Sequence, residues 1–265
     1  MQAPLTEPTP YPEVNDVLIR LLTEARAVLG QEFVGLYLYG SLATGDFDPQ
    51  RSDIDFLIVT SHFLPEQTIA ALEKMHHGFA QSDNKWDRKL EGLYIPLAEL
   101  SHYKEQGPEL PTVNERYFYI ARQGSDWVIQ RHLLREHETI VAGPSIREFI
   151  EPVPAQEMRT AVCAIMRSWW APMIDDPTWL DGRPEYQAFA VQTMCRVLYT
   201  LKFSSAVSKT KAAKWALEAL GGEWTVLITD AAGWPDTWPA DLQQVQDFIR
   251  YTNDQRLPDE FNEPA

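Results

Sequence analysis

Residues 33–60 place the strongest constraint on what this chain can fold into. Residues 33–39 are rich in aromatic and β-branched side chains and predict a strand, which ends at Gly40-Ser41. After a polar stretch, residues 53–60 predict a second strand with a strongly apolar body. An apolar strand of this kind belongs in a core, so the first part of the chain is expected to build a sheet around this segment.

Two carboxylates open the second predicted strand. Side chains two residues apart on a strand return to the same face, so Asp53 and Asp55 project together, with Ile54 and Phe56 on the other side. Adjacent carboxylates repel each other unless a cation lies between them. Magnesium suits the pair, because it binds through one or two carboxylates together with substrate phosphates. Taken alone, such a pair is also common on a solvated strand edge.

The Gly40-Ser41 step adds a place for phosphate. A Gly-Ser after a strand can start a short helix, whose N-terminal amides and hydroxyl group hold phosphate oxygens. The order strand, Gly-Ser, short helix and Asp-x-Asp strand resembles the DNA polymerase β-like nucleotidyltransferase superfamily. A third carboxylate is expected on the next strand, where Glu91 interrupts an apolar run. Glu91 is a candidate general base for an acceptor hydroxyl, or a sheet-edge carboxylate that faces water.

The pattern along the chain predicts an α+β protein. In the first half the predicted elements are helices at 14–29, 65–79 and 127–137 and strands at 33–39, 53–60 and 90–97. Residues 98–116 are polar and predict a long loop. In the second half only helices are predicted, at about 155–170, 186–204, 209–220, 223–231 and 239–253. We therefore expect a flexible arm (1–12), a mixed sheet with flanking helices (13–153) and an all-α helical bundle (154–265).

The charge of the chain restricts its partners. The net charge is −15, whereas nucleic-acid binding needs a basic surface, so no nucleic-acid partner is expected. The acidity is compatible with a small cationic substrate and equally with plain solubility. No apolar run approaches the roughly 20 residues of a membrane helix, and the N-terminus lacks a secretory signal pattern. We expect a cytoplasmic protein, a monomer, without membrane contact.

Cysteine and histidine provide no predicted metal site. Cys163 and Cys195 lie in apolar, helix-like stretches and suit reduced, buried thiols. His76 and His77 lack Cys or His partners at zinc spacing and are predicted on the surface.

Three groups of residues resemble the streptomycin/spectinomycin adenylyltransferases, a family of aminoglycoside nucleotidyltransferases, over about residues 30–255. The first is Leu38-Tyr39-Gly40-Ser41 with Ser52-Asp53-Ile54-Asp55. The second is Arg135-Glu136-His137 with Ala142-Gly143-Pro144 and Glu151-Pro152-Val153-Pro154. The third is Cys195-Arg196-Val197-Leu198-Tyr199-Thr200 with Ser208-Lys209 and Ala212-Ala213-Lys214-Trp215-Ala216.

The resemblance implies a nucleotidyltransferase domain and an α-helical domain that clamps nucleotide and substrate, with ATP and the substrate bound in the cleft between them. It implies that Gly40, Ser41 and Ser52 bind nucleotide phosphates. In the helical domain, Arg196 and Lys209 would reach the β- and γ-phosphates. Positive charge there would stabilise the charge that develops on the departing pyrophosphate.

The same resemblance implies the chemistry. The enzyme would transfer AMP from ATP, its co-substrate, to a hydroxyl group of an aminoglycoside-type antibiotic. Asp53 and Asp55 would bind Mg²⁺, and Glu91 would be the catalytic base.

The residues expected to contact the acceptor depart from the family pattern. In the family an aromatic residue in the loop after the third strand stacks on streptomycin, but no Trp lies between Glu91 and Asn114. We therefore expect spectinomycin rather than streptomycin. Acidic residues before the Arg196 helix hold drug ammonium groups in the family, and the candidates here are Asp176, Asp181 and Glu185. An acidic cluster that merely favours a helix start is the alternative.

Two other functions stay open from the sequence. A nucleotidyltransferase could act on another small metabolite or on a protein side chain. A nucleotide-binding regulator could retain the fold without catalysis.

Overall fold

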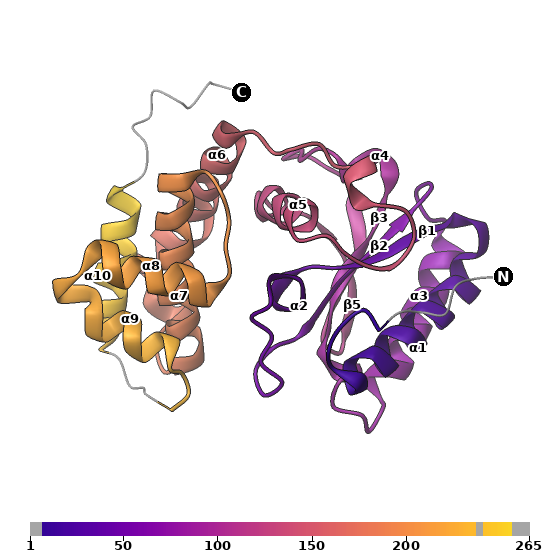
Figure 1. The fold of residues 1–265 in the computed structure, drawn as a ribbon, viewed down its shortest axis with the longest axis horizontal. Helices are drawn as coiled ribbons and strands as arrows, with labels where there is room; N and C mark the ends of the chain where they lie inside the picture. Colours follow the sequence, from indigo (N-terminus) through magenta and orange to yellow (C-terminus); the bar gives the residue numbers. More distant parts are fainter. Residues whose placement is uncertain (1–6, 237–240, 256–265) are drawn as a thin grey trace. The chain divides into compact units, whose positions relative to one another are not determined.

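The computed structural model describes residues 7–236 and 241–255. The chain forms two compact units, Met1–Pro152 and Val153–Ala265 (Figure 1). The first unit combines a sheet with helices, and the described part of the second contains helices without a strand. The predicted α+β class is confirmed. Within the described ranges, none of the helices combines the length and the apolar character needed to cross a bilayer.

The first unit is built on a six-stranded sheet with the order β5-β4-β3-β2-β1-β6. Its strands are β1 (Phe33–Leu38), β2 (Ile54–Thr60), β3 (Leu90–Pro96), β4 (Glu109–Asn114), β5 (Tyr117–Arg122) and β6 (Thr139–Ala142). β2 and β3 are parallel, and the other neighbouring pairs are antiparallel. The crossover between the parallel strands runs through α3 (Glu66–Ala80), as a parallel connection requires.

Helices cover both faces of the central strands. Helix α1 (Pro12–Leu29) and α3 pack on one face, and α5 (Asp126–Glu136) packs on the other (Figure 1). β2 alternates between the two cores: Ile54, Phe56 and Ile58 join the first, whereas Leu57 and Val59 join the second. Because both faces are covered, β2 reads as an almost continuous apolar run. Each fully buried side chain of this kind contributes about 1.5–3 kcal/mol.

Gly92 allows β3 to lie close against β2. It is paired with Phe56, and a Cβ at this position would collide with the Phe56 carbonyl oxygen and ring. A side chain here would therefore push the two parallel strands apart.

The segment 98–116, predicted as a loop, is partly regular. It contains most of α4 (Leu97–Leu100) and all of β4, and β5 follows directly. β4 was not predicted because it contains Pro111, and proline is unfavourable inside a sheet. Pro111 lies beyond the three residues of β4 that pair with β3, so it removes no hydrogen bond on that side. β5 lies at the edge of the sheet with most of its side chains at least partly exposed, so its hydrophobic alternation is weak.

The expected arm at residues 1–12 falls partly outside the described residues, which begin at 7. From there the chain is fixed. Thr9 is buried and its hydroxyl donates to Asn15 Oδ1 at 2.7 Å. The Tyr11 hydroxyl donates to the Phe47 carbonyl at 3.2 Å, and α1 begins at Pro12.

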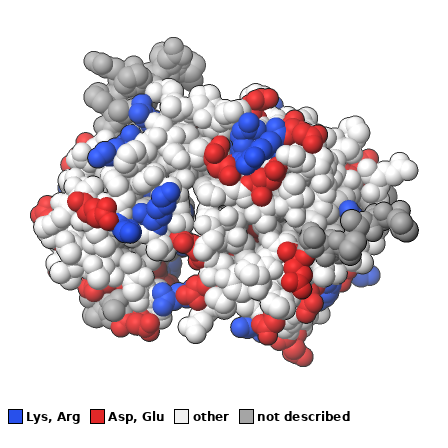
Figure 2. Space-filling view, in the orientation of Figure 1, with Lys and Arg blue, Asp and Glu red and all other residues white. Residues whose placement is uncertain are grey.

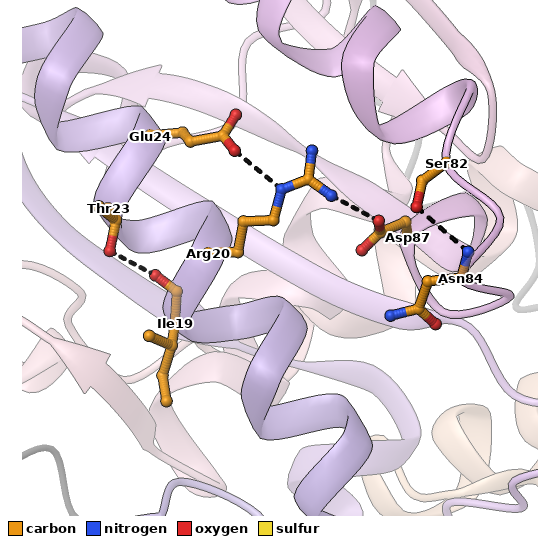
Figure 3. Close-up of polar contacts among 7 residues, drawn as sticks. All are labelled: Ile19, Arg20, Thr23, Glu24, Ser82, Asn84 and Asp87. Carbon is orange, nitrogen blue, oxygen red and sulfur yellow. Dashed lines mark hydrogen bonds and ion pairs between the residues drawn. The ribbon is translucent and has the colours of Figure 1, made fainter.

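Arg20 of α1 holds the segment that leads into β3 (Figure 3). Its guanidinium group contacts Glu24 Oε1 at 2.8 Å and Asp87 Oδ2 at 2.6 Å, and it lies 4.0 Å above the Phe79 ring. Asp87, in the short helix η2 (Asp87–Lys89), is only 2% exposed. A buried carboxylate needs such a partner, and its loss would leave an uncompensated charge next to β3.

The second unit is organised around α7 (Pro184–Phe203), which contacts every other α-helix of the unit. The others are α6 (Ala155–Ile165), α8 (Lys209–Leu220), α9 (Thr225–Ala232) and α10 (Leu242–Asp254). Between α6 and α7 lie the π-helix η4 (Met166–Trp170) and the short 3-10 helices η5 (Ala171–Ile174) and η6 (Pro177–Trp179), and the 3-10 helix η7 (Gly222–Trp224) precedes α9. Half of the residues of α7 are buried, as expected of a central helix.

His76 is buried, which corrects the prediction that it lies on the surface. Its Nε2 lies 2.7 Å from the Tyr94 hydroxyl, and its ring stacks between Phe56 and Phe118. Its Nδ1 is buried without a hydrogen-bond partner among the described residues. Burial lowers the pKa of His76 from 6.5 to about 3, so the folded protein keeps this imidazole neutral.

The buried imidazole predicts that stability falls in mild acid. Between pH 6.5 and 3 the unfolded chain binds a proton at His76 that the folded chain excludes, so the free energy of unfolding decreases as pH falls. The slope from this one group is about 1.4 kcal/mol per pH unit. Urea unfolding of wild type and His76→Phe at pH 7.5, 6.0 and 5.0 measures it as the difference between the two slopes. His77→Phe, at the exposed neighbour, is the control. Equal slopes for wild type and His76→Phe would contradict the prediction.

Candidate functional site

Asp55 and Glu91 lie side by side on adjacent strands. They are register partners in the parallel pairing of β2 with β3, and both are partly exposed. Residues paired in this way share a face of the sheet, with strands about 4.8 Å apart. The sequence predicted that both carboxylates belong to one site, and the register brings them together.

The pKa of Tyr39 is affected by the negative charge of this site. Tyr39 is buried at the end of β1, and its amide donates to the Asp55 carbonyl at 3.2 Å. Burial raises the pKa of Tyr39 well above 10, and the negative charges of Asp55 and Glu91 raise it further. The phenol therefore stays neutral beside two carboxylates, and both act on it within the reach of short-range electrostatics.

Gly40 leaves room for the Asp55 carboxylate. It begins the five-residue helix α2 (Gly40–Thr44) with φ of 60°, a left-handed conformation that favours glycine. A Cβ on Gly40 would collide with the Asp55 side chain. Gly40 of the predicted Gly-Ser step thus lies directly against Asp55, one of the two predicted metal-binding carboxylates.

The loop before β2 is closed by Ser52. Its Oγ accepts from the Asp48 amide at 3.0 Å, and its amide donates to the Asp48 carbonyl at 2.8 Å. These bonds fix the turn that ends at Asp53, immediately before β2. Ser52 thereby positions Asp53, and the phosphate contact expected of its hydroxyl stays a prediction.

Lys89 forms an ion pair with Asp53, a contact that the sequence alone does not predict. The Lys89 Nζ lies 2.8 Å from Asp53 Oδ1 and 3.6 Å from Glu115 Oε1. Burial lowers the pKa of Lys89, but the hydrogen bond and charge of Asp53 and the charge of Glu115 outweigh it, so the net shift is upward. The only signal in the sequence is a lysine two residues before Glu91, because the pairing depends on the fold.

The donor set fits a divalent cation. Asp53 already contacts a cation, the ammonium of Lys89, and the Asp55 carboxylate packs against Gly40, in the space that a Cβ would fill. Magnesium needs one or two carboxylates and takes its remaining ligands from phosphates and water. Within residues 7–236 and 241–255 no group of three or more His, Cys, Asp or Glu side chains is arranged to hold a metal.

Two tyrosines of β5 extend the same face beyond Glu91. The register pairs Glu91 with Asn114 and Asn114 with Tyr117, and it places Tyr119 two pairs further along, opposite Thr112 of β4. Burial and the charge of Glu91 raise the pKa of Tyr119, and Tyr117 is 72% exposed. Both tyrosines lie outside the interval between Glu91 and Asn114, on a strand that the sequence does not predict.

In the second unit, Arg196 and Lys209 lie on the contacting helices α7 and α8. Arg196 is half-buried and its Nη2 donates to Thr193 Oγ1 at 3.3 Å. Lys209 is exposed at the first residue of α8, with its Nζ 5.1 Å from the Phe189 ring centroid. Their predicted contact with phosphates stays a prediction.

The acidic candidates of the second unit are all exposed. Asp176 Oδ1 accepts from the Thr178 amide at 3.1 Å, and the hydrogen bonds from Thr178 lower its pKa. Asp176 thus acts as the N-cap of η6, which supports the helix-start alternative for this residue. Asp181 and Glu185 are exposed before and at the start of α7.

An aromatic cluster accompanies these carboxylates. Trp169 and Trp179 have ring centroids 6.0 Å apart and are 46% and 50% exposed. The Trp169 Nε1 donates to the Tyr186 hydroxyl at 2.8 Å, whereas Trp170 is buried. The Arg183 guanidinium group lies 5.0 Å from the centroid of the Trp179 ring, so the second unit presents partly exposed aromatic rings with a cation already against one of them.

The surface carries both signs of charge. Figure 2 shows acidic side chains beside basic ones over the face in view, in keeping with a net charge of −15.

Two family models match the chain. Residues 22–103 match the nucleotidyltransferase domain, and residues 148–255 match the C-terminal domain of aminoglycoside adenylyltransferase. The first match contains Gly40, Asp53, Asp55 and Glu91, and the second contains Arg196.

The chain is also similar along most of its length to individual proteins. It is 24% identical to the aminoglycoside (3'') (9) adenylyltransferase of Shigella flexneri, covering 90% of this chain and 93% of that protein. It is 23% identical to the spectinomycin 9-adenylyltransferase of Staphylococcus aureus, covering 90% and 94%. Among solved structures, it resembles the spectinomycin adenyltransferase AAD(9) from Enterococcus faecialis with ATP and spectinomycin. That likeness has a TM-score of 0.71 at 19% identity and covers 91% of this chain and 98% of the other.

The two domain matches agree with the two units of the fold, and the carboxylates of the first unit lie where a nucleotidyltransferase domain is matched. The chain belongs to the aminoglycoside adenylyltransferase family of nucleotidyltransferases.

Proposed function

We propose that the protein transfers AMP from ATP to a hydroxyl group of an aminoglycoside-type antibiotic and releases pyrophosphate. The observation that carries the proposal is the pairing of Asp55 with Glu91 beside Gly40, with Asp53 at the start of the same strand. The similar proteins named above support ATP as the donor and spectinomycin as the first acceptor to test.

Asp53 and Asp55 would hold Mg²⁺ against the phosphates. Bound there, the ion would neutralise negative charge on the triphosphate and on the departing pyrophosphate. Gly40 and Ser41 would bind phosphate oxygens at the start of α2, and Ser52 would do so from the preceding turn.

Glu91 would act as the general base. Its carboxylate would take the proton of the acceptor hydroxyl while that oxygen attacks the α-phosphorus in line. The new oxygen–phosphorus bond forms as the bond to pyrophosphate breaks. The role follows from its position, because Glu91 shares a face with Asp55 and borders the tyrosines of β5.

The second unit would clamp nucleotide and acceptor. Arg196 and Lys209 would bind the β- and γ-phosphates and stabilise the charge on pyrophosphate. Asp176, Asp181 and Glu185 would attract a cationic acceptor, whose rings suit the exposed faces of the aromatic cluster. We also propose that the protein acts as a monomer in the cytoplasm, where ATP is available.

Asp53→Asn is predicted to abolish turnover while the fold survives. The amide keeps the size of the side chain but removes the charge that binds the metal ion. Pyrophosphate release measures turnover, and thermal unfolding checks the fold. Asp83→Asn, an exposed aspartate of the same unit, is the matched control. Retained turnover in Asp53→Asn would remove Asp53 from the metal site.

Glu91→Gln is predicted to lower the rate by roughly 10²–10⁴-fold, the range typical for loss of a general base. ATP binding should persist, because the carboxylate acts on the acceptor; a thermal shift with ATP measures it. Near-normal turnover would assign Glu91 to the sheet edge instead.

Spectinomycin is predicted to be adenylylated in preference to streptomycin. The expectation rests on the absence of Trp between Glu91 and Asn114 and on the similarity to spectinomycin adenylyltransferases. Mass spectra of an aminoglycoside panel after incubation with ATP and magnesium would show the gain of one AMP, lost in Asp53→Asn. Streptomycin modified as fast as spectinomycin would assign the stacking role to an aromatic outside that interval, such as Tyr119. Modification of no drug, with ATP still bound, would direct the search to metabolite or protein acceptors.

A further inference from the structure

Lys89 occupies the carboxylate that the proposed function gives to the metal ion. Its Nζ contacts Asp53 Oδ1 at 2.8 Å, and the two side chains are only 35% and 29% exposed. A short, charge-assisted contact of this kind occupies one of the two carboxylate oxygens of Asp53 and neutralises the charge that a divalent ion would need. The ammonium and the metal ion therefore compete for Asp53.

Glu115 offers the ammonium group of Lys89 a second carboxylate partner. Its Oε1 lies 3.6 Å from the Lys89 Nζ. Glu115 lies in the turn between β4 and β5 with φ of 52°, a left-handed conformation that is unfavourable for a residue with a Cβ. Its amide donates to the carbonyl of Leu90 at 2.9 Å, which fixes this turn beside Lys89. The backbone thus holds one carboxylate on each side of a single cation.

We propose that Lys89 is a positioning residue that neutralises Asp53 in the nucleotide-free enzyme and moves to Glu115 when metal-bound nucleotide enters. The inference rests on the proposed function, because it takes Asp53 as a metal ligand. Lys89 then weakens metal binding by having to be displaced, and Glu115 offsets part of that loss. The free site is kept from accumulating the repulsion of Asp53 and Asp55.

The test compares Lys89→Met, Glu115→Gln and the double variant in the full-length protein. Mn²⁺ is titrated alone and with the non-hydrolysable analogue α,β-methylene-ATP, and free Mn²⁺ is measured by its electron paramagnetic resonance signal. Lys104→Met is the matched control, since Lys104 pairs with Glu99 at 3.2 Å in the same unit. Thermal unfolding of every variant shows whether the fold is kept.

Lys89→Met is expected to bind Mn²⁺ about fivefold more tightly than wild type, the scale of a partly exposed ion pair. Glu115→Gln is expected to bind it about fivefold more weakly, because Lys89 is then left with Asp53 alone. The double variant should match Lys89→Met, since Glu115 acts through Lys89. Lys104→Met should match wild type. A general charge effect of Glu115 would instead make the double variant bind more weakly than Lys89→Met, and would overturn the exchange.

The Asp53→Asn variant distinguishes a failure of the proposed role of Lys89 from a failure of the proposed metal site. Loss of Mn²⁺ binding in Asp53→Asn, with unchanged or weaker binding in folded Lys89→Met, would overturn the role of Lys89 and leave the proposed function standing. Mn²⁺ binding that Asp53→Asn does not weaken would overturn the metal site itself, and the inference on Lys89 with it.

Discussion

The parallel pairing of β2 with β3 determines where the charged residues of the first unit meet. Each strand is buried on both faces, so its apolar side chains fit only one register. A shift by one residue would turn Glu91 toward the core under α1 and α3. Gly92 lets the strands approach at Phe56, and the same approach sets Asp55 beside Glu91. Hydrophobic packing thereby fixes the spacing of two carboxylates that would otherwise repel each other.

Much of this arrangement could be predicted from local pattern. The alternation of Asp53, Ile54, Asp55 and Phe56 follows from the geometry of any strand, and the burial of Ile54 and Phe56 agrees with it. The metal-binding pair, the phosphate place at Gly40-Ser41 and the candidate base Glu91 were inferred from the residues, the roles of Ser52, Arg196 and Lys209 came from the resemblance, and all of them stay predictions. The family itself could be recognised because three groups of short motifs are spread over about residues 30–255.

What the sequence concealed depends on contacts between distant segments. β4 contains a proline and β5 has its side chains largely exposed, so neither shows the alternation that marks a strand. The pairing of Lys89 with Asp53 spans 36 residues, and no local pattern predicts it. His76 seemed a surface residue on an amphipathic helix, yet Tyr94 and Phe118 enclose it. In each case the partner, and not the residue, decides the environment.

The contact of Arg20 with Asp87 gives the N-terminal helix a part in the chemistry. Residues 87–91 contain the buried Asp87, then Lys89, which pairs with Asp53, and then the proposed base Glu91. Asp87 is held by Arg20 of α1, 67 residues earlier in the chain. Helix α1 thus helps to position the segment that carries Lys89 and Glu91, although it contributes none of the proposed site residues. A substitution of Arg20 would therefore act on the segment that carries Lys89 and Glu91 while leaving every proposed site residue unchanged.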